Sequence, residues 1–191
     1  STLHSELEQN KRSRVLDCGT GTGSGLIGLI ERGVLKEADI QAFDIDSELV
    51  ADMPRLFQQY AARNGYHYEP IRYDKKDDFS FGIADSSKGI DIKVHGFTED
   101  VYGLARREGQ LRGTDLITGQ AFIEHVNPGM VYPTLMMLLN EEGLVYFHMN
   151  CDGWFNYSPS EDRERDERVV GLFNDLALNN QRFNNNYGSI F

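Results

Sequence analysis

The sequence has few of the features that mark secreted, membrane or disulfide-stabilised proteins. It contains two cysteines in 191 residues, Cys18 and Cys151, which is too few for a disulfide framework and fits a reducing compartment. No apolar run approaches the roughly 20 residues that a membrane-spanning helix needs. The chain also does not open on a basic segment followed by an apolar one, as a secretion signal does. We therefore expect a cytoplasmic protein with no membrane partner.

Positive charge is scarce as well. The chain has 19 Lys and Arg residues against 30 Asp and Glu, for a formal net charge of −11 at pH 7. Proteins that bind nucleic acids rely on clusters of Lys and Arg that release counterions from phosphates. The densest basic group, Arg163, Arg165 and Arg168, alternates with acids as on a solvated helix face. We expect no nucleic-acid partner, and the composition favours a neutral or cationic small molecule, or a carrier-bound one.

Strand patterns and helical patterns alternate along the chain. Strands are predicted at 14–18, 39–46, 90–97, 114–119 and 143–150, and helices at 24–32, 48–62, 99–108, 130–140 and 161–179. This alternation predicts one doubly wound α/β domain over residues 1–191, with a parallel sheet and right-handed crossovers. The run at 143–150 is almost continuously apolar, which is typical of a strand buried on both faces. Residues 66–90 are too long for an ordinary connection and predict a local hairpin or an insertion.

The first predicted strand runs into a glycine-rich turn, D-C-G-T-G-T-G at 17–23. A dinucleotide-binding turn has the spacing G-x-G-x-x-G, whereas these glycines occur at every second residue behind an acid. A phosphate site, a site for a nucleoside with an amino-acid tail, and a tight turn without a ligand all remain open. The second strand pattern contains Asp44, twenty-one residues after Gly23, where an acid can accept both hydroxyls of a ribose.

These residues resemble a known family. V-L-D-C-G-T-G-T-G followed by A-F-D-I-D is similar to motif I and the next acidic motif of class I S-adenosylmethionine-dependent methyltransferases. T-D-L-I-T-G-Q-A-F-I-E-H-V resembles their motif IV and the residues after it, and G-L-V-Y-F resembles their fifth strand. The similarity covers about residues 14–150. It implies a Rossmann-like methyltransferase sheet and S-adenosylmethionine as the cofactor.

The resemblance also implies a role for each motif residue. Asp17 would orient the ammonium of the methionine end, Asp44 would hold the ribose hydroxyls, and Ile45 would lie against adenine. The methionine and the ribose would be lined by Gly19, Thr20, Gly21 and Gly23. Such a ligand carries an ammonium and a sulfonium but no phosphate, so an acid at the turn suits it and would repel a pyrophosphate.

The adenine end is less regular, because the family's Gly-Asp-Ala-like step is replaced by G-F-T-E-D at 96–100. Phe97 is assigned to the adenine face, with a place in the core as the alternative, and Thr98 or Glu99 to the adenine amino group. At the end of the fourth strand, Gly119 is expected near the ligand through its backbone, whereas Gln120 needs no role beyond solvation.

The residues after the fourth strand bear on the methyl acceptor. Amino-methylating relatives carry N-P-P-Y or D-P-P-Y there, so T-G-Q-A-F-I-E-H-V disfavours a nucleic-acid or glutamine N-methyltransferase. The E-H-V run resembles small-molecule methyltransferases of the ubiquinone-biosynthesis type and implies His125 as a general base, with a structural histidine as the alternative. Relatives that hold a metal carry E-x-x-E-H, and Ala121 replaces the first acid here, so we predict no metal site.

The chain ends before the last two strands of the family sheet. An uncovered fifth strand would expose an edge, so we expect a further C-terminal segment or another chain to cover it. The sequence as a whole predicts a methyltransferase that acts on a small molecule, with O-methylation slightly preferred. A non-catalytic methyltransferase-like domain is the main alternative, and a nicotinamide-dependent dehydrogenase is a further one that the glycine spacing disfavours.

Overall fold

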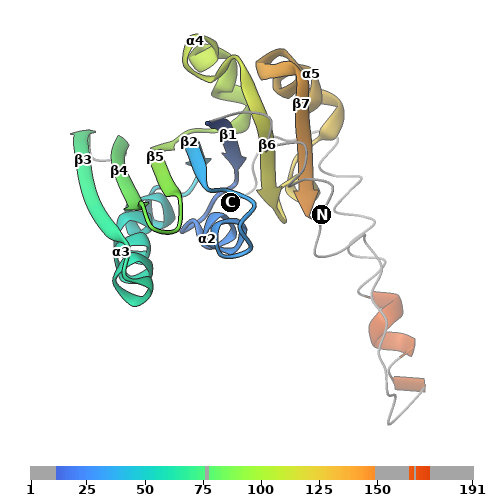
Figure 1. Cartoon of the computed structure of the whole chain (residues 1–191). Coiled ribbons are helices and arrows are strands. Elements are labelled where there is room, and N and C mark those ends of the chain that lie inside the picture. Colours follow the sequence, from blue (N-terminus) through green and yellow to red (C-terminus); the bar gives the residue numbers. More distant parts are fainter. Residues whose placement is uncertain (1–11, 76–77, 149–163, 166, 173–191) are drawn as a thin grey trace.

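The computed structural model describes residues 12–75, 78–148, 164–165 and 167–172 (Figure 1). The strands are β1 Ser13–Cys18, β2 Glu37–Asp44, β3 His67–Lys75, β4 Asp78–Asp85, β5 Ile90–Thr98, β6 Thr114–Gln120 and β7 Leu139–His148. The helices are α2 Ser24–Glu31, α3 Ser47–Asn64, α4 Glu108–Leu111 and α5 Pro128–Leu138, with 3-10 turns η1 Val101–Arg107 and η2 Ile123–His125. Of the predicted helix at 161–179, residues 164–165 and 167–172 are described and are helical.

The strands form one sheet in the order β3-β4-β5-β2-β1-β6-β7. The five strands from β5 to β7 in this order are parallel, and the chain moves outward from β1 through β2 to β5 before it returns to β6 on the other side of β1. The strand order therefore reverses between β1 and β6. This arrangement confirms the predicted doubly wound, Rossmann-like fold, in which ligands bind at the carboxyl ends of the strands near such a reversal.

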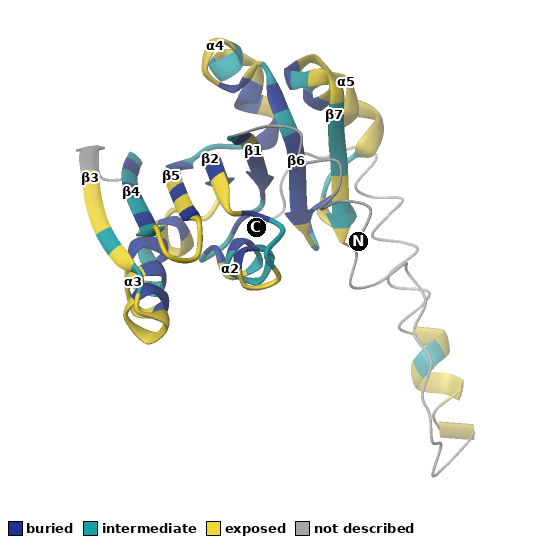
Figure 2. Cartoon of the chain, viewed as in Figure 1, coloured by how far each residue is buried: buried dark blue, intermediate teal, exposed yellow. Residues whose placement is uncertain are grey.

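Buried residues lie on both faces of the sheet (Figure 2). On one face, Val15 and Ile40 pack in a cluster with residues of α2 and α3 such as Leu26 and Phe57. On the other face, Leu16 and its neighbours pack in a second cluster with η1 and α5. Adjacent residues of β1 thus face opposite cores, because side chains alternate along a strand. Two covered faces explain why the central strands are apolar throughout.

The predicted irregular segment at 66–90 folds as a hairpin. Strands β3 and β4 pair antiparallel, and β4 continues antiparallel onto β5, so that the hairpin extends the sheet beyond β5. Phe81 of β4 is fully buried and its ring lies 4.9 Å from that of Phe57 in α3. The apolar residues of β4 therefore attach the hairpin to the core under α3, and of the two expectations the hairpin is confirmed.

The strand predicted at 143–150 is present as β7 over its described residues, but the prediction of its burial was wrong. Residues 143–150 were expected to be buried on both faces, but β7 begins at Leu139 and lies at the end of the strand order, with β6 as its one partner among the described residues. Its side chains are half-buried or exposed, and Tyr146 is 43 % exposed. An apolar run is enough to predict a strand. It does not predict how far that strand is buried, which depends on the strands and helices that pack against it.

Candidate functional site

The loop between β1 and α2 has an unusual backbone. Gly19, Gly21 and Gly23 have positive φ angles of +63°, +54° and +81°, a region in which side chains other than that of glycine are strained. Every second residue of the loop thus has a left-handed backbone, and Gly23 then caps α2 without a side-chain hydrogen bond. The alternating glycines of the sequence are therefore first of all a requirement of the backbone.

Packing accounts for two of these glycines as well. A Cβ on Gly19 would lie 3.0 Å from Cδ2 of Phe122, and one on Gly23 would lie 2.7 Å from Cε2 of Phe57. A Cβ on Gly21 would have no neighbour within 4 Å. Gly21 is thus the one of the three that faces open space, whereas the other two lie against the two cores.

The loop is held by the end of strand β2. The backbone N–H of Thr20 donates to the carbonyl of Phe43 at 2.9 Å, and that of Gly21 donates to Oδ2 of Asp44 at 2.8 Å. The second carboxylate oxygen of Asp44 accepts from the N–H of Asp46 at 3.0 Å, where the chain turns toward α3. Asp44 therefore braces two turns, a role that its position at a strand end did not indicate.

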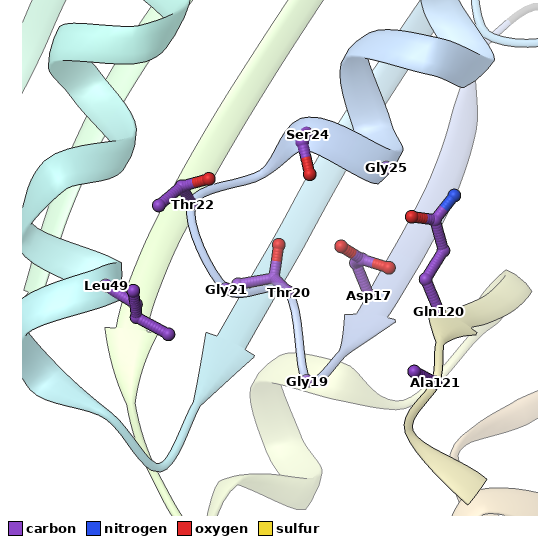
Figure 3. A pocket seen from close by; sticks show the side chains of 10 residues that line it. All are labelled: Asp17, Gly19, Thr20, Gly21, Thr22, Ser24, Gly25, Leu49, Gln120 and Ala121. Atoms are coloured by element: carbon purple, nitrogen blue, oxygen red, sulfur yellow. The ribbon is translucent and has the colours of Figure 1, made fainter. Parts of the chain in front are cut away.

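A cavity of about 340 Å³ opens between this loop and the end of β6 (Figure 3). Small-molecule sites in proteins have volumes of about 300–1,000 Å³. The residues that line the cavity are Asp17, Gly19, Thr20, Gly21, Thr22, Ser24, Gly25, Leu49, Gln120 and Ala121. It lies at the carboxyl ends of β1 and β6, where the strand order reverses and where a doubly wound sheet binds its ligand.

Asp17 is the one charged residue of the cavity lining. Its side chain is almost fully buried, and this burial, opposed by the neighbouring Thr20 hydroxyl and aided by the negative charge of Asp44, raises its pKa to about 7. Near neutral pH the carboxyl group is therefore close to half ionised. A cation in the cavity would favour the ionised form.

The hydroxyl of Thr20 lies in the same part of the cavity. Thr20 is 7 % exposed, and its Oγ1 is close to Asp17 without the geometry of a hydrogen bond, so it has no partner among the described residues. Buried polar atoms are almost always paired in folded proteins, and an unpaired one calls for an explanation. A polar ligand is one partner that the lining of a cavity can acquire.

Two residues at the end of β6 belong to the cavity but were missed by sequence reasoning. The side chain of Gln120 lies against Gly25 in the first turn of α2, since a Cβ on Gly25 would be 2.9 Å from Gln120 Cδ. Ala121 has φ +53°, a positive value that no other non-glycine residue of the described chain adopts, and its N–H donates to the carbonyl of His148 at 2.8 Å. A non-glycine residue in this region costs about 1–2 kcal/mol, and such strain gathers at functional sites.

Four of the predicted site residues line the cavity together: Asp17, Gly19, Thr20 and Gly21. Gly23 ends the loop against Phe57 and Asp44 supports the loop from β2, and neither lines the cavity. Ile45, which follows Asp44, is 61 % exposed and lies outside the lining. Their contacts with a ligand stay predictions.

Phe97 and Thr98, the predicted adenine contacts, lie at the end of β5 outside the cavity lining. Phe97 is 1 % exposed, stacks on Phe43 with ring centroids 5.9 Å apart, and carries the guanidinium of Arg107 at 4.3 Å above its ring. Thr98 pairs in register with Asp44, and its buried Oγ1 has no hydrogen-bond partner among the described residues. The position of Phe97 is the one expected of a core residue, the alternative that the sequence left open.

The remaining predicted residues lie around η2. Gly119 is buried, and a Cβ there would lie 2.7 Å from the carbonyl oxygen of Cys18, so its small size serves the packing of β6 on β1. His125 is exposed at the end of η2 and does not line the cavity. Its proposed role as a base is not tested by this geometry.

Within residues 12–75, 78–148, 164–165 and 167–172, no three His, Cys, Asp or Glu side chains are grouped so that they could hold a metal ion. No helix of this same part is both long and apolar enough to cross a membrane.

Comparisons with known proteins found similarity among solved structures. No family model matches the chain, and neither does any curated protein sequence. The plantazolicin methyltransferase BamL, solved with SAH, is 15 % identical over 76 % of this chain with a TM-score of 0.48. A SAM-dependent methyltransferase from Aquifex aeolicus is 16 % identical over 92 % (TM-score 0.46), and the methyltransferase domain of bacterial CtHen1-C is 17 % identical over 93 % (TM-score 0.46). The chain spans 41 % of the length of BamL and 78 % of each of the other two.

Proposed function

We propose that the protein binds S-adenosylmethionine and transfers its methyl group to a small molecule. One observation carries the proposal: the cavity at the strand-order reversal has a buried carboxylate, Asp17, as its single charged lining residue. The cofactor's methionine end carries an ammonium and a sulfonium. Both are cations that an ionised Asp17 attracts.

The same feature argues against a nicotinamide dinucleotide. A pyrophosphate binds where N–H donors and a positive potential face it, whereas the one charged residue of this lining is an acid, with no Lys or Arg to offset it. An acid close to the loop would repel phosphate oxygens. The dehydrogenase alternative is therefore not favoured by the charge of the site.

The residues present fit S-adenosylmethionine in size and in polar groups. The cavity of about 340 Å³ lies in the range of small-molecule sites, and the hydroxyl of Thr20 is available to a polar ligand. Asp44 uses one acceptor position on each carboxylate oxygen for a backbone N–H, and a carboxylate offers about four such positions. The acceptor positions that remain on the Asp44 carboxylate suit the two hydroxyls of a ribose.

When bound, S-adenosylmethionine supplies a methyl group on a positively charged sulfur, ready for in-line displacement. The chain's own residues then have to orient the two reactants and keep water out, which accounts for much of the rate of such a reaction. Asp17 holds the ammonium, and the loop with Gly21 lets the ligand approach the backbone. His125 serves as a general base where the acceptor must lose a proton, as in O-methylation, which we slightly prefer.

Calorimetric titration with S-adenosylmethionine, its demethylated product SAH, and NADH tests the proposal. We expect heat with the first two and none with NADH. Absence of binding to both adenosyl compounds would contradict the proposed function. If both bind but no methyl transfer occurs to any acceptor, the non-catalytic domain becomes the better description. The variant His125→Ala should retain the affinity for SAH and lose turnover, and full activity would assign His125 a structural role.

A further inference from the structure

The contact between Gln120 and Gly25 joins two elements across the mouth of the cavity. Gln120 ends β6, and Gly25 lies in the first turn of α2. Both line the cavity, and Figure 3 shows the Gln120 side chain extended toward Gly25 on the same side as the carboxylate of Asp17. The distances from an added Cβ on Gly25, 2.9 Å to Cδ and 3.1 Å to Oε1 of Gln120, show that the amide group itself makes the contact.

The charges of the cavity suit the Gln120 amide to binding a carboxylate. An amino-acid tail carries a carboxylate beside its ammonium, and the ionised Asp17 that attracts the ammonium repels the carboxylate. No Lys or Arg in the lining can balance that repulsion. A glutamine amide carries no charge and has two N–H donors beside its carbonyl oxygen, so its amino group can bind a carboxylate that Asp17 repels.

We infer that Gln120 reads the carboxylate of the ligand's amino-acid tail and that Gly25 is small so that the Gln120 amide can reach this position. The inference rests on the proposed function and assigns the recognition of a zwitterion to two neighbouring strands: Asp17 on β1 for the ammonium and Gln120 on β6 for the carboxylate. It makes Gly25 a positioning residue, since an added methyl would displace the amide group.

Three ligands separate the contributions. SAH carries the ammonium and the carboxylate, S-adenosyl-3-thiopropylamine carries the ammonium alone, and 5′-methylthioadenosine carries neither. Hydrogen bonds to charged groups are strong enough that we expect Gln120→Ala to weaken SAH binding about tenfold. The affinities for the other two ligands should stay unchanged. Equal affinities of the wild type and Gln120→Ala for SAH, or an equal loss for all three ligands, would overturn the inference.

The role of Gly25 is tested by a double-mutant cycle. Cδ and Oε1 of Gln120 are at the end of a flexible side chain, so Gly25→Ala should fold and, as a glycine-to-alanine change in a helix, should not lower thermal stability. We expect it to weaken SAH binding as Gln120→Ala does and to add nothing in the Gln120→Ala background. A loss that persists in that background would mean that the methyl obstructs the ligand directly, and it would contradict the positioning role.

Gly28→Ala is the matched control in the same helix. A Cβ at Gly28 would meet Nη1 of Arg32, which is exposed, and Gly28 does not line the cavity. Its affinity for SAH should equal that of the wild type. An equal loss of SAH affinity in Gly28→Ala and Gly25→Ala would contradict the positioning role of Gly25. If the wild type binds none of the three ligands, the proposed function itself fails, a result distinct from every outcome for the variants.

Discussion

The N–H of Gly21 donates to Oδ2 of Asp44 at 2.8 Å, so the acid that ends β2 holds the middle of the loop that ends β1. This hydrogen bond links the glycine loop after β1 to the acid at the end of β2, two motifs that lie apart in the sequence. It also means that any change at Asp44 acts on the loop as well as on a ligand.

Asp44→Ala should therefore lower both stability and affinity. Its carboxylate accepts two backbone N–H groups, and loss of such bonds to a charged group costs about 1–3 kcal/mol in the free energy of unfolding. Loss of the ribose contact should weaken SAH binding by a further 1.5–3 kcal/mol or so. Urea unfolding and calorimetry measure the two effects.

Asp46→Ala is the control for this change. Asp46 caps α3 by accepting from the N–H groups of Glu48 and Leu49, so its loss should cost about 1 kcal/mol of stability without a change in affinity. Unchanged SAH binding in Asp44→Ala would place the ribose elsewhere.

Asp17 should make stability fall as the pH rises from about 4 to 7. Its pKa is raised from 3.8 to about 7 by burial, so within this window the folded state keeps a proton that the unfolded state has released. Between pH 5 and 8 this amounts to about 2–3 kcal/mol. The stability of Asp17→Asn relative to the wild type should therefore increase by that amount from pH 5 to pH 8. A difference that does not change with pH would show that Asp17 titrates normally.

The affinity for SAH should rise with pH up to about 7, because the ionised form of Asp17 holds the ammonium. Below the pKa of Asp17 the affinity should fall by up to about tenfold per pH unit, since the proton must leave before the cation binds. Calorimetry between pH 5.5 and 8 follows this change. 5′-Methylthioadenosine, which has no ammonium, should bind with a flat profile, and a flat profile for SAH as well would argue against an Asp17–ammonium contact.

The glycines of the loop should respond differently to alanine. Gly23→Ala adds a Cβ 2.7 Å from Phe57 at a φ of +81°, so we expect a loss of about 2–4 kcal/mol in stability. Gly21→Ala meets no atom and should lose about 1–2 kcal/mol from its backbone alone. Because Gly21 lines the cavity, its variant should also weaken SAH binding.

Gly33→Ala separates strain from ligand contact. Gly33 has a φ of +68°, and an added Cβ would lie no closer than 3.7 Å to Lys36, so its strain resembles that of Gly21. It lies outside the cavity lining, and its SAH affinity should equal that of the wild type. Equal affinities of Gly21→Ala and Gly33→Ala would show that the ligand does not approach the loop at Gly21.

The alternation of strand and helix patterns was enough to predict the doubly wound sheet, because each pattern depends on local periodicity. The length of 66–90, too great for an ordinary connection, predicted a hairpin or an insertion there. The sequence did not indicate that this hairpin would extend the sheet beyond β5, or that the side chains of β7 would be half-buried or exposed, as that of Tyr146 is. Those outcomes depend on which strands become neighbours.

For the site, the sequence by itself determined the glycine loop, Asp17 and the acid Asp44, since spacing along the chain is enough to identify a strand, a turn and an acid at the next strand end. Only the tertiary structure decided which of them share a cavity. Gln120 and Ala121 line it because β6 lies beside β1, although they are about a hundred residues from Asp17 in sequence. Phe97 is buried in the core, where its ring stacks on Phe43 and lies under the guanidinium of Arg107. Such contacts arise from the packing of distant segments, and no local pattern encodes them.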